Sequence, residues 1–136
     1  MITKQTAATL GLCLTRFEHA HSYVKEHIDE IGKKAQYPKL FKDIKAACDA
    51  KRAFLFTSPK VDGFFILRPR PANVMQVWVA YCTEKNAVAQ YQQVLESLCR
   101  EVGATTIEFE TSLPTMERFM PRFGWKKAYT VWRKPL

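Results

Sequence analysis

The chain has 136 residues, 47% of them apolar, and carries a formal net charge of +8. This length supports one ordinary hydrophobic core and excludes two independent ones, so we expect a single domain over residues 1–136. No stretch approaches the roughly 20 apolar residues of a membrane span, and the N-terminus has no charged segment followed by an apolar one. We therefore expect a cytoplasmic protein with no membrane partner.

The positive charge is unevenly distributed along the chain. Residues 33–70 carry a net charge of +7 and residues 114–136 one of +5, whereas residues 1–32 and 71–113 carry −1 and −3. Such a surface attracts phosphate-bearing ligands, nucleic acid or acidic proteins. Nucleic-acid binding is a minor alternative, because the aromatic runs between Arg52 and Arg68 lack an RNP-like motif and are explained more simply as core.

The cysteines and histidines give no metal or disulfide signal. Each cysteine stands alone, without a CxxC pair or a histidine at ligand distance, so we expect buried free thiols. The histidines form no i, i+4 pair, so we expect them on a helix surface and predict no metal site. These residues are Cys13, Cys48, Cys82, Cys99, His19, His21 and His27.

Two helices are expected in the first third of the chain. Apolar residues recur every three or four positions from Thr6 to Ile31, which predicts an amphipathic helix that Gly32 ends. A second helix is predicted from Lys39 to Lys51, with Pro38 at its first turn.

Three strands are expected next. Arg52–Thr57 and Phe64–Arg68 are short apolar and aromatic runs joined by turn residues, which predicts an antiparallel hairpin. The prolines after Arg68 end the second strand, and Val74–Cys82 is predicted as the third.

The last third predicts a parallel crossover. The helix expected from Asn86 to Val102 ends at Gly103 and is followed by a strand from Thr105 to Thr111, which alternates apolar and acidic residues. A short helix around Met116–Met120 and a last strand from Trp125 to Arg133 complete the pattern. Strands that alternate with helices indicate a βαβ unit, and parallel strand ends are where ligands are usually held.

This order of elements, together with several residues in the tail, resembles the GNAT acetyltransferase superfamily. The likeness lies in a long helix that ends at Gly103-Ala104, the strand TTIEFET and the run ERFMPRFGW, and it is closest to divergent acetyltransferase-like proteins of tailed phages. The resemblance implies an α+β fold. It implies a mixed sheet of five to six strands, two N-terminal helices, a central βαβ crossover and a short C-terminal helix.

The resemblance also implies a cofactor site. In the family, acetyl-coenzyme A lies where two parallel strands separate, and a glycine-rich loop holds its pyrophosphate. Here the loop has no glycine, which leaves two alternatives, a chain that binds acetyl-coenzyme A and one that binds no cofactor. The corresponding residues are Tyr81, Cys82, Thr83, Lys85, Asn86, Ala87 and Val88.

Met120 stands where the family usually has the tyrosine that reprotonates the leaving thiolate, and a thioether cannot donate a proton. The candidate substitutes are Tyr81, Glu110 and Tyr129, with Glu108 as a further carboxylate.

Two functions of different classes follow. The favoured one is a degenerate GNAT-like binding or structural module, encoded by a phage and acting as a virion component or on a host protein. Its location would be the host cytoplasm or the virion, and its partner a protein. The alternative is an active N-acetyltransferase that acetylates a small amine or a protein amine.

Overall fold

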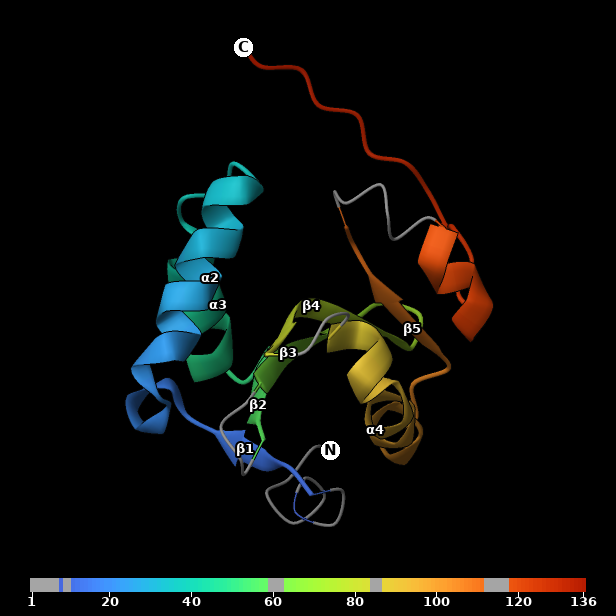
Figure 1. Cartoon of the computed structure of the whole chain (residues 1–136), viewed down its shortest axis with the longest axis horizontal. Helices are drawn as coiled ribbons and strands as arrows, with labels where there is room; N and C mark the ends of the chain where they lie inside the picture. Colours follow the sequence, from blue (N-terminus) through green and yellow to red (C-terminus); the bar gives the residue numbers. More distant parts are fainter. Residues whose placement is uncertain (1–7, 9–10, 59–62, 84–86, 112–117) are drawn as a thin grey trace.

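The computed structural model describes residues 8, 11–58, 63–83, 87–111 and 118–136. Its sheet has five strands in the order β1-β2-β3-β4-β5, and helices α2 and α3 cover one face while α4 covers the other (Figure 1). The elements are β1 (Cys13–Thr15), η1 (Phe17–His19), α2 (Ser22–Lys34), α3 (Leu40–Asp49), β2 (Phe54–Thr57), β3 (Gly63–Arg70), β4 (Val74–Cys82), α4 (Ala87–Glu101), β5 (Thr106–Phe109) and η2 (Met120–Phe123).

The two faces of the sheet carry separate apolar clusters. Neighbouring residues of a strand point to opposite faces, so Phe64 packs with α2 and α3 while Phe65 packs with α4. Both rings are fully buried, as are Leu95 and Leu98 of α4. Burial on both faces explains why these strands read as continuous apolar runs.

The predicted α+β architecture is confirmed, with two N-terminal helices and a central βαβ crossover. Strands β1 to β4 pair antiparallel and β5 pairs with β4 in parallel. Helix α4 ends close to the predicted Gly103, which has the left-handed φ of 80° that favours glycine.

The prediction of one helix from Thr6 to Ile31 is wrong over residues 11–21, and residues 6, 7, 9 and 10 lie outside the described part of the chain. Cys13–Thr15 forms an edge strand that pairs with β2, and α2 begins only at Ser22, where the His21 side chain accepts a hydrogen bond from the Tyr23 amide at 3.2 Å. Leu12 and Leu14 join the cluster under α4. Their alternation with exposed Cys13 is a strand period, and pairing with β2 prevails over the helical spacing.

The prediction that Gly32 ends its helix is wrong, because Gly32 lies buried inside α2. A Cβ there would lie 2.6 Å from the Tyr37 carbonyl oxygen and 3.2 Å from the Leu40 Cβ. The glycine is needed for the close approach of the two helices.

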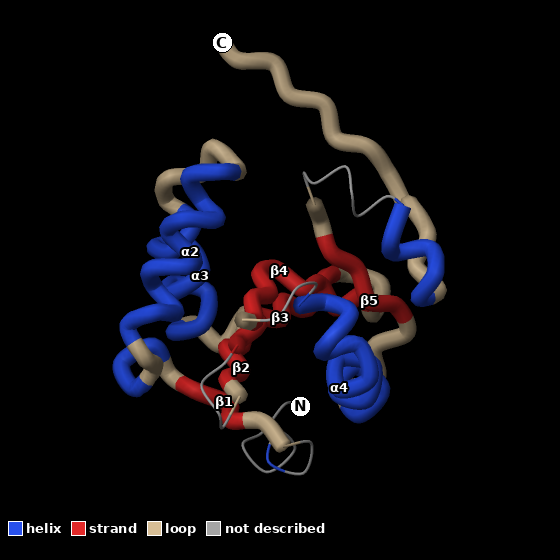
Figure 2. The backbone as a smooth tube through the Cα atoms, viewed as in Figure 1, coloured by secondary structure: helices blue, strands red, loops and turns tan. Residues whose placement is uncertain are grey.

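The predicted last strand, Trp125 to Arg133, is also wrong, while the five strands of the described sheet, which include β1, agree with the predicted five to six. Residues 125–136 belong to no helix or strand and run away from the sheet (Figure 2). The Trp125 ring packs edge-on against Phe109 at 5.0 Å between centroids, and its Nε1 donates to Gln92 Oε1 at 3.1 Å. Trp125 is therefore held on the α4 face of the sheet and not alongside β5.

The predicted short helix is present as the helical residues Arg118 and Phe119 followed by η2, and its beginning lies outside the described residues.

The cysteines form no disulfide bond, but they are not all buried. Cys99 is buried, Cys48 and Cys82 are half-buried, and Cys13 is exposed. Burial raises the pKa of Cys48 to about 12 and that of Cys99 to about 11, so both are neutral thiols at physiological pH.

No cluster of potential metal ligands occurs among the residues described. No helix among them has the length and apolar character needed to cross a membrane.

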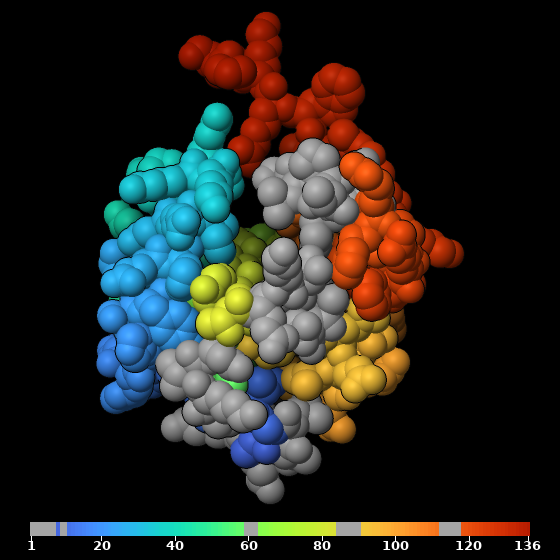
Figure 3. Space-filling model, in the orientation of Figure 1, coloured from blue at the N-terminus to red at the C-terminus, as the bar shows by residue number. Residues whose placement is uncertain are grey.

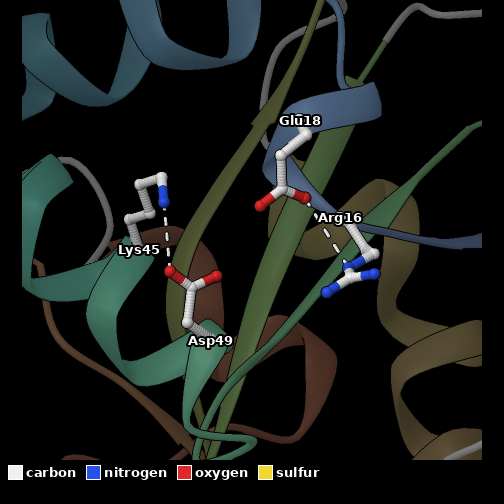
Figure 4. Close-up of polar contacts among 4 residues, drawn as sticks. All are labelled: Arg16, Glu18, Lys45 and Asp49. Carbon is white, nitrogen blue, oxygen red and sulfur yellow. Dashed lines mark hydrogen bonds and ion pairs between the residues drawn. The ribbon is translucent and has the colours of Figure 1, made fainter.

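Ion pairs on the surface add little to this core. Arg16 Nε lies 3.6 Å from Glu18 Oε2, and Lys45 Nζ lies 3.0 Å from Asp49 Oδ2 (Figure 4). All four side chains are between 42% and 76% exposed, so solvent screens these pairs and they contribute little to stability. The fold depends on its two apolar clusters.

The contact between α2 and α3 gives the first prediction. Alanine normally stabilises a helix interior relative to glycine by roughly 0.5–1 kcal/mol. At Gly32 we expect the opposite, because the Gly32→Ala methyl group would collide with backbone. Chemical denaturation should show the free energy of unfolding lowered by about 1–3 kcal/mol. The control, Lys33→Ala at an exposed position, should change it by less than about 0.5 kcal/mol; a stabilised Gly32→Ala variant would contradict the packing described.

Candidate functional site

The most informative feature of the sheet is the place where β4 and β5 separate. Their parallel pairing runs from Val74 opposite Thr106 to Val77 opposite Phe109, where β5 ends. Strand β4 continues to Cys82 and stays paired with β3 on its other side. No described strand pairs with the β5-facing edge of β4 from Trp78 to Tyr81.

A β-bulge in β4 lies at the same level. Ile66 of β3 faces Val79, while the next residue, Leu67, faces Val77, so Trp78 has no partner on β3. The Arg68 guanidinium covers the Trp78 ring at 3.9 Å from its centroid. Because a bulge bends its strand and increases its twist, it accounts for the turn of β4 away from β5.

A chain of polar side chains crosses the sheet just before the bulge. Gln76 is only 4% exposed, and its Oε1 accepts a hydrogen bond from Arg68 Nε at 2.9 Å. Gln76 Nε2 donates to Glu110 Oε1 at 3.3 Å, and the Tyr129 hydroxyl donates to the same oxygen at 3.4 Å. A buried amide thus fixes the carboxylate of Glu110, which in turn holds the phenol of Tyr129.

The phenol of Tyr129 is kept protonated by its neighbours. The carboxylates of Glu108 and Glu110 raise the pKa of Tyr129 because they disfavour a nearby phenolate, and Arg70 offsets part of this effect. Tyr129 is 57% exposed. It is therefore an accessible neutral hydroxyl that can donate a proton, beside a carboxylate that can accept one.

Tyr81 lies in a different group from the other two predicted catalytic residues. Its half-buried ring stacks on His27 at 3.8 Å between centroids and packs near Tyr23 and Phe64. No hydrogen bond or ring contact joins Tyr81 to Glu110 or Tyr129 among the described residues. The structure thus brings together Glu110 and Tyr129, and packs Tyr81 against α2.

The predicted cofactor-binding residues fall where β4 passes into α4. Tyr81 and Cys82 end the strand, and Thr83 follows as an exposed residue. The backbone of Ala87 and Val88 opens the 15-residue α4, whereas Lys85 and Asn86 lie outside the described residues. A strand edge without a strand partner therefore leads to a helix start, whose amides carry partial positive charge.

Two residues of this region escaped the sequence analysis. The sequence predicts His27 on the helix surface, but its ring is half-buried against Tyr81. Its place one helical turn after Tyr23, whose ring it also contacts, is the sequence feature that indicates this packing. Gln76 was overlooked although it interrupts the apolar run VMQVWVAY, and a lone polar residue in such a run indicates a buried hydrogen-bonding role. Met120 is buried, 5% exposed, and so occupies a packing position.

The surface is hollowed between α2 and the C-terminal part of the chain, and atoms of the sheet form the floor (Figure 3). Tyr129 of the C-terminal segment contacts Glu110, and His27 of α2 stacks on Tyr81 of β4. The separated strands and these side chains together form the candidate site.

Comparison with solved structures bears on this arrangement. A probable acetyltransferase matches with a TM-score of 0.66 at 14% identity, over 92% of this chain and 97% of the other. The fold is that of the GNAT acetyltransferases. A Trypanosoma brucei acetyltransferase (TM-score 0.59, 13% identity, 92% and 98% of the two chains) and the ribosomal-protein-alanine N-acetyltransferase of Brucella melitensis biovar Abortus (0.59, 16%, 92% and 98%) have similar structures.

Similarity at this level is structural only. No family model matches the sequence, and no curated protein matches it. At identities of 13–16%, the structural likeness shows a GNAT-like fold alone, and the activity has to be argued from the site itself.

The electrostatics of Tyr129 give the second prediction. Replacing Glu108→Gln or Glu110→Gln removes a negative charge beside the phenol, so the pKa of Tyr129 should fall toward its ordinary value. The double variant should show the larger fall. NMR titration of tyrosines labelled with carbon-13, with Tyr129→Phe to assign the resonance, measures the change. Glu96→Gln, at a partly exposed position of α4, is the control, and an equal fall in that variant would contradict the local cause.

Proposed function

We propose that the chain is an N-acetyltransferase that binds acetyl-coenzyme A between β4 and β5. The observation that carries this proposal is the edge of β4 from Trp78 to Tyr81, which has no described strand partner although it lies inside the sheet. Backbone N–H and C=O groups are costly to leave unsatisfied, so such an edge favours a ligand with peptide-like amides. The pantetheine arm of coenzyme A is a ligand of that kind.

The start of α4 offers the second contact. The backbone amides of its first turn suit a pyrophosphate through their partial positive charge, and Ala87 keeps one side chain there small. When bound, acetyl-coenzyme A would supply a thioester as the acyl donor. The residues that would hold it are Tyr81, Cys82, Thr83, Ala87 and Val88, together with Lys85 and Asn86 of the connecting loop.

Glu110 and Tyr129 suit the proton transfers of the reaction. Glu110 is exposed, carries no ion pair among those described, and is oriented by Gln76, so it can accept the proton of an acceptor amine. Tyr129 stays neutral and can return a proton to a leaving group. Tyr81 would shape the α2 side of the site. The acceptor would be a small amine or a protein amine, in line with the Brucella protein named for its action on a ribosomal-protein alanine.

A second candidate is a degenerate GNAT-like module that does no chemistry. It is supported by the lack of glycine from Thr83 to Ala89 and by the exposed apolar side chains near the C-terminus. In this reading the chain is phage-encoded and acts as a virion component or on a host protein, in the host cytoplasm or the particle. It predicts a stoichiometric protein partner and no need for a cofactor.

Titration calorimetry with acetyl-coenzyme A and with coenzyme A separates the two candidates. We expect micromolar binding of both ligands. Ala87→Glu should weaken it about 10-fold or more, because a carboxylate at the helix start repels the pyrophosphate. The matched control, Ala46→Glu on the exposed face of α3, should bind like the unmodified chain.

The outcomes are distinct. Absence of heat with millimolar ligand would exclude the acetyltransferase and favour the module. Binding that Ala87→Glu leaves unchanged would place the ligand elsewhere and contradict the proposed site.

A further inference from the structure

The two strongly basic parts of the sequence, residues 33–70 and 114–136, touch at one end of the molecule. Arg133 Nη1 lies 3.5 Å from the carbonyl oxygen of Ala35, the residue that follows α2, although 98 positions separate the two in the chain. Figure 3 shows the C-terminal segment (red) and the turn between α2 and α3 (cyan) at the same end of the molecule. Positive charge from both parts of the chain is therefore gathered there.

The basic side chains at this end are all exposed. Residues 33–39 and 132–136 carry five basic side chains and no acidic one. We call these five side chains the basic surface, and they are Lys33, Lys34, Lys39, Arg133 and Lys134. The ion pairs among the described residues involve only one of them, Lys34, whose Nζ lies 3.7 Å from Glu30 Oε1. Like charges at this density attract a polyanion, because its binding releases condensed counterions.

The ring of Trp132 adds an aromatic platform to this charge. Trp132 directly precedes Arg133 and is 91% exposed, so its indole ring is open to a ligand. An exposed aromatic ring beside cations is the combination that binds single-stranded nucleic acid, since bases stack on the ring while phosphates contact the cations. An acidic protein surface would match the charge alone and gives no role to the exposed ring.

The aromatic residues of strands β2 and β3 do not offer such a platform. Their sequence also combines aromatic and basic residues, but Phe56, Phe64 and Phe65 are fully buried. The Arg68 guanidinium lies over the Trp78 ring of the same sheet. A nucleic-acid surface is therefore supported at the basic surface and not at the hairpin.

We propose that the basic surface and Trp132 bind single-stranded nucleic acid. One base stacks on the Trp132 ring, and neighbouring phosphates contact Arg133 and the lysines at the α2–α3 turn. A single strand suits this surface better than a duplex, because its bases are free to leave their own stack. Recognition by stacking and charge gives little preference for base sequence. The surface uses no residue assigned to the acetyl-coenzyme A site, so this binding does not depend on the proposed function.

Fluorescence anisotropy of the full chain with a labelled oligouridine of about 12 nucleotides tests the stacking contact. Trp132→Ala should weaken binding about 10-fold or more, because the base loses its platform. The matched control, Trp132→Tyr, keeps an aromatic ring and should retain most of the affinity. The circular dichroism of the three chains should agree, since Trp132 lies outside the core.

The salt dependence of the same binding tests the charge contact. Replacing Lys33→Gln together with Lys39→Gln should weaken binding and reduce the slope of log affinity against log salt by about 0.7 for each lost phosphate contact. The control pair, Arg100→Gln with Arg122→Gln, removes the same charge from exposed positions of α4 and η2. It should bind like the unmodified chain.

Oligodeoxythymidine of the same length shows whether DNA is bound as well as RNA, and binding of either supports the proposal. Three results would overturn it: no binding of either strand at low salt, binding that Trp132→Ala leaves unchanged, or an equal loss in the two double variants. Tighter binding of polyglutamate than of both oligonucleotides would also overturn it and assign the surface to an acidic protein. Titration with acetyl-coenzyme A remains a separate result, because the two tests share no variant.

Discussion

The end of the β4–β5 pairing at Val77 and Phe109 is the constraint on which the rest of the molecule depends. Strand β5 is too short to follow β4, and the bulge at Trp78 turns β4 away at the same level. An open backbone edge would be a defect in an ordinary sheet. Its position directly before the start of α4 makes it the natural place for a ligand with both amide and phosphate groups.

The polar side chains around this opening are ordered by one buried residue. Gln76 is almost fully buried, and its amide is satisfied by Arg68 on one side and Glu110 on the other. This pairing fixes the Glu110 carboxylate at the edge of the site, where it accepts a hydrogen bond from Tyr129, and Glu108 and Glu110 together raise the pKa of that phenol.

The sequence predicts the centre of the fold better than its margins. Strands β2 to β5 and helix α4 are recognisable because they are buried on one or both faces and their periods are clear. Strand β1 was missed because three residues that pair only with an edge leave a weak pattern. The last strand was predicted from residues that do favour strands, but a strand also needs an edge to pair with, and Trp125 directs the chain away from β5. In the site, the contact between Glu110 and Tyr129 and the stacking of Tyr81 on His27 both depend on how distant segments cross the sheet, which the sequence pattern does not contain.

Hydrogen exchange of the backbone amides of β4, measured residue by residue by NMR, tests the central claim most directly. Along Trp78–Tyr81, successive amides point alternately toward β3 and toward the opening. In saturating acetyl-coenzyme A, the amides that face the opening should exchange more slowly, while those bonded to β3 stay unchanged. Equal exchange rates with and without the ligand, at concentrations where binding is complete, would contradict the claim that this edge holds the cofactor.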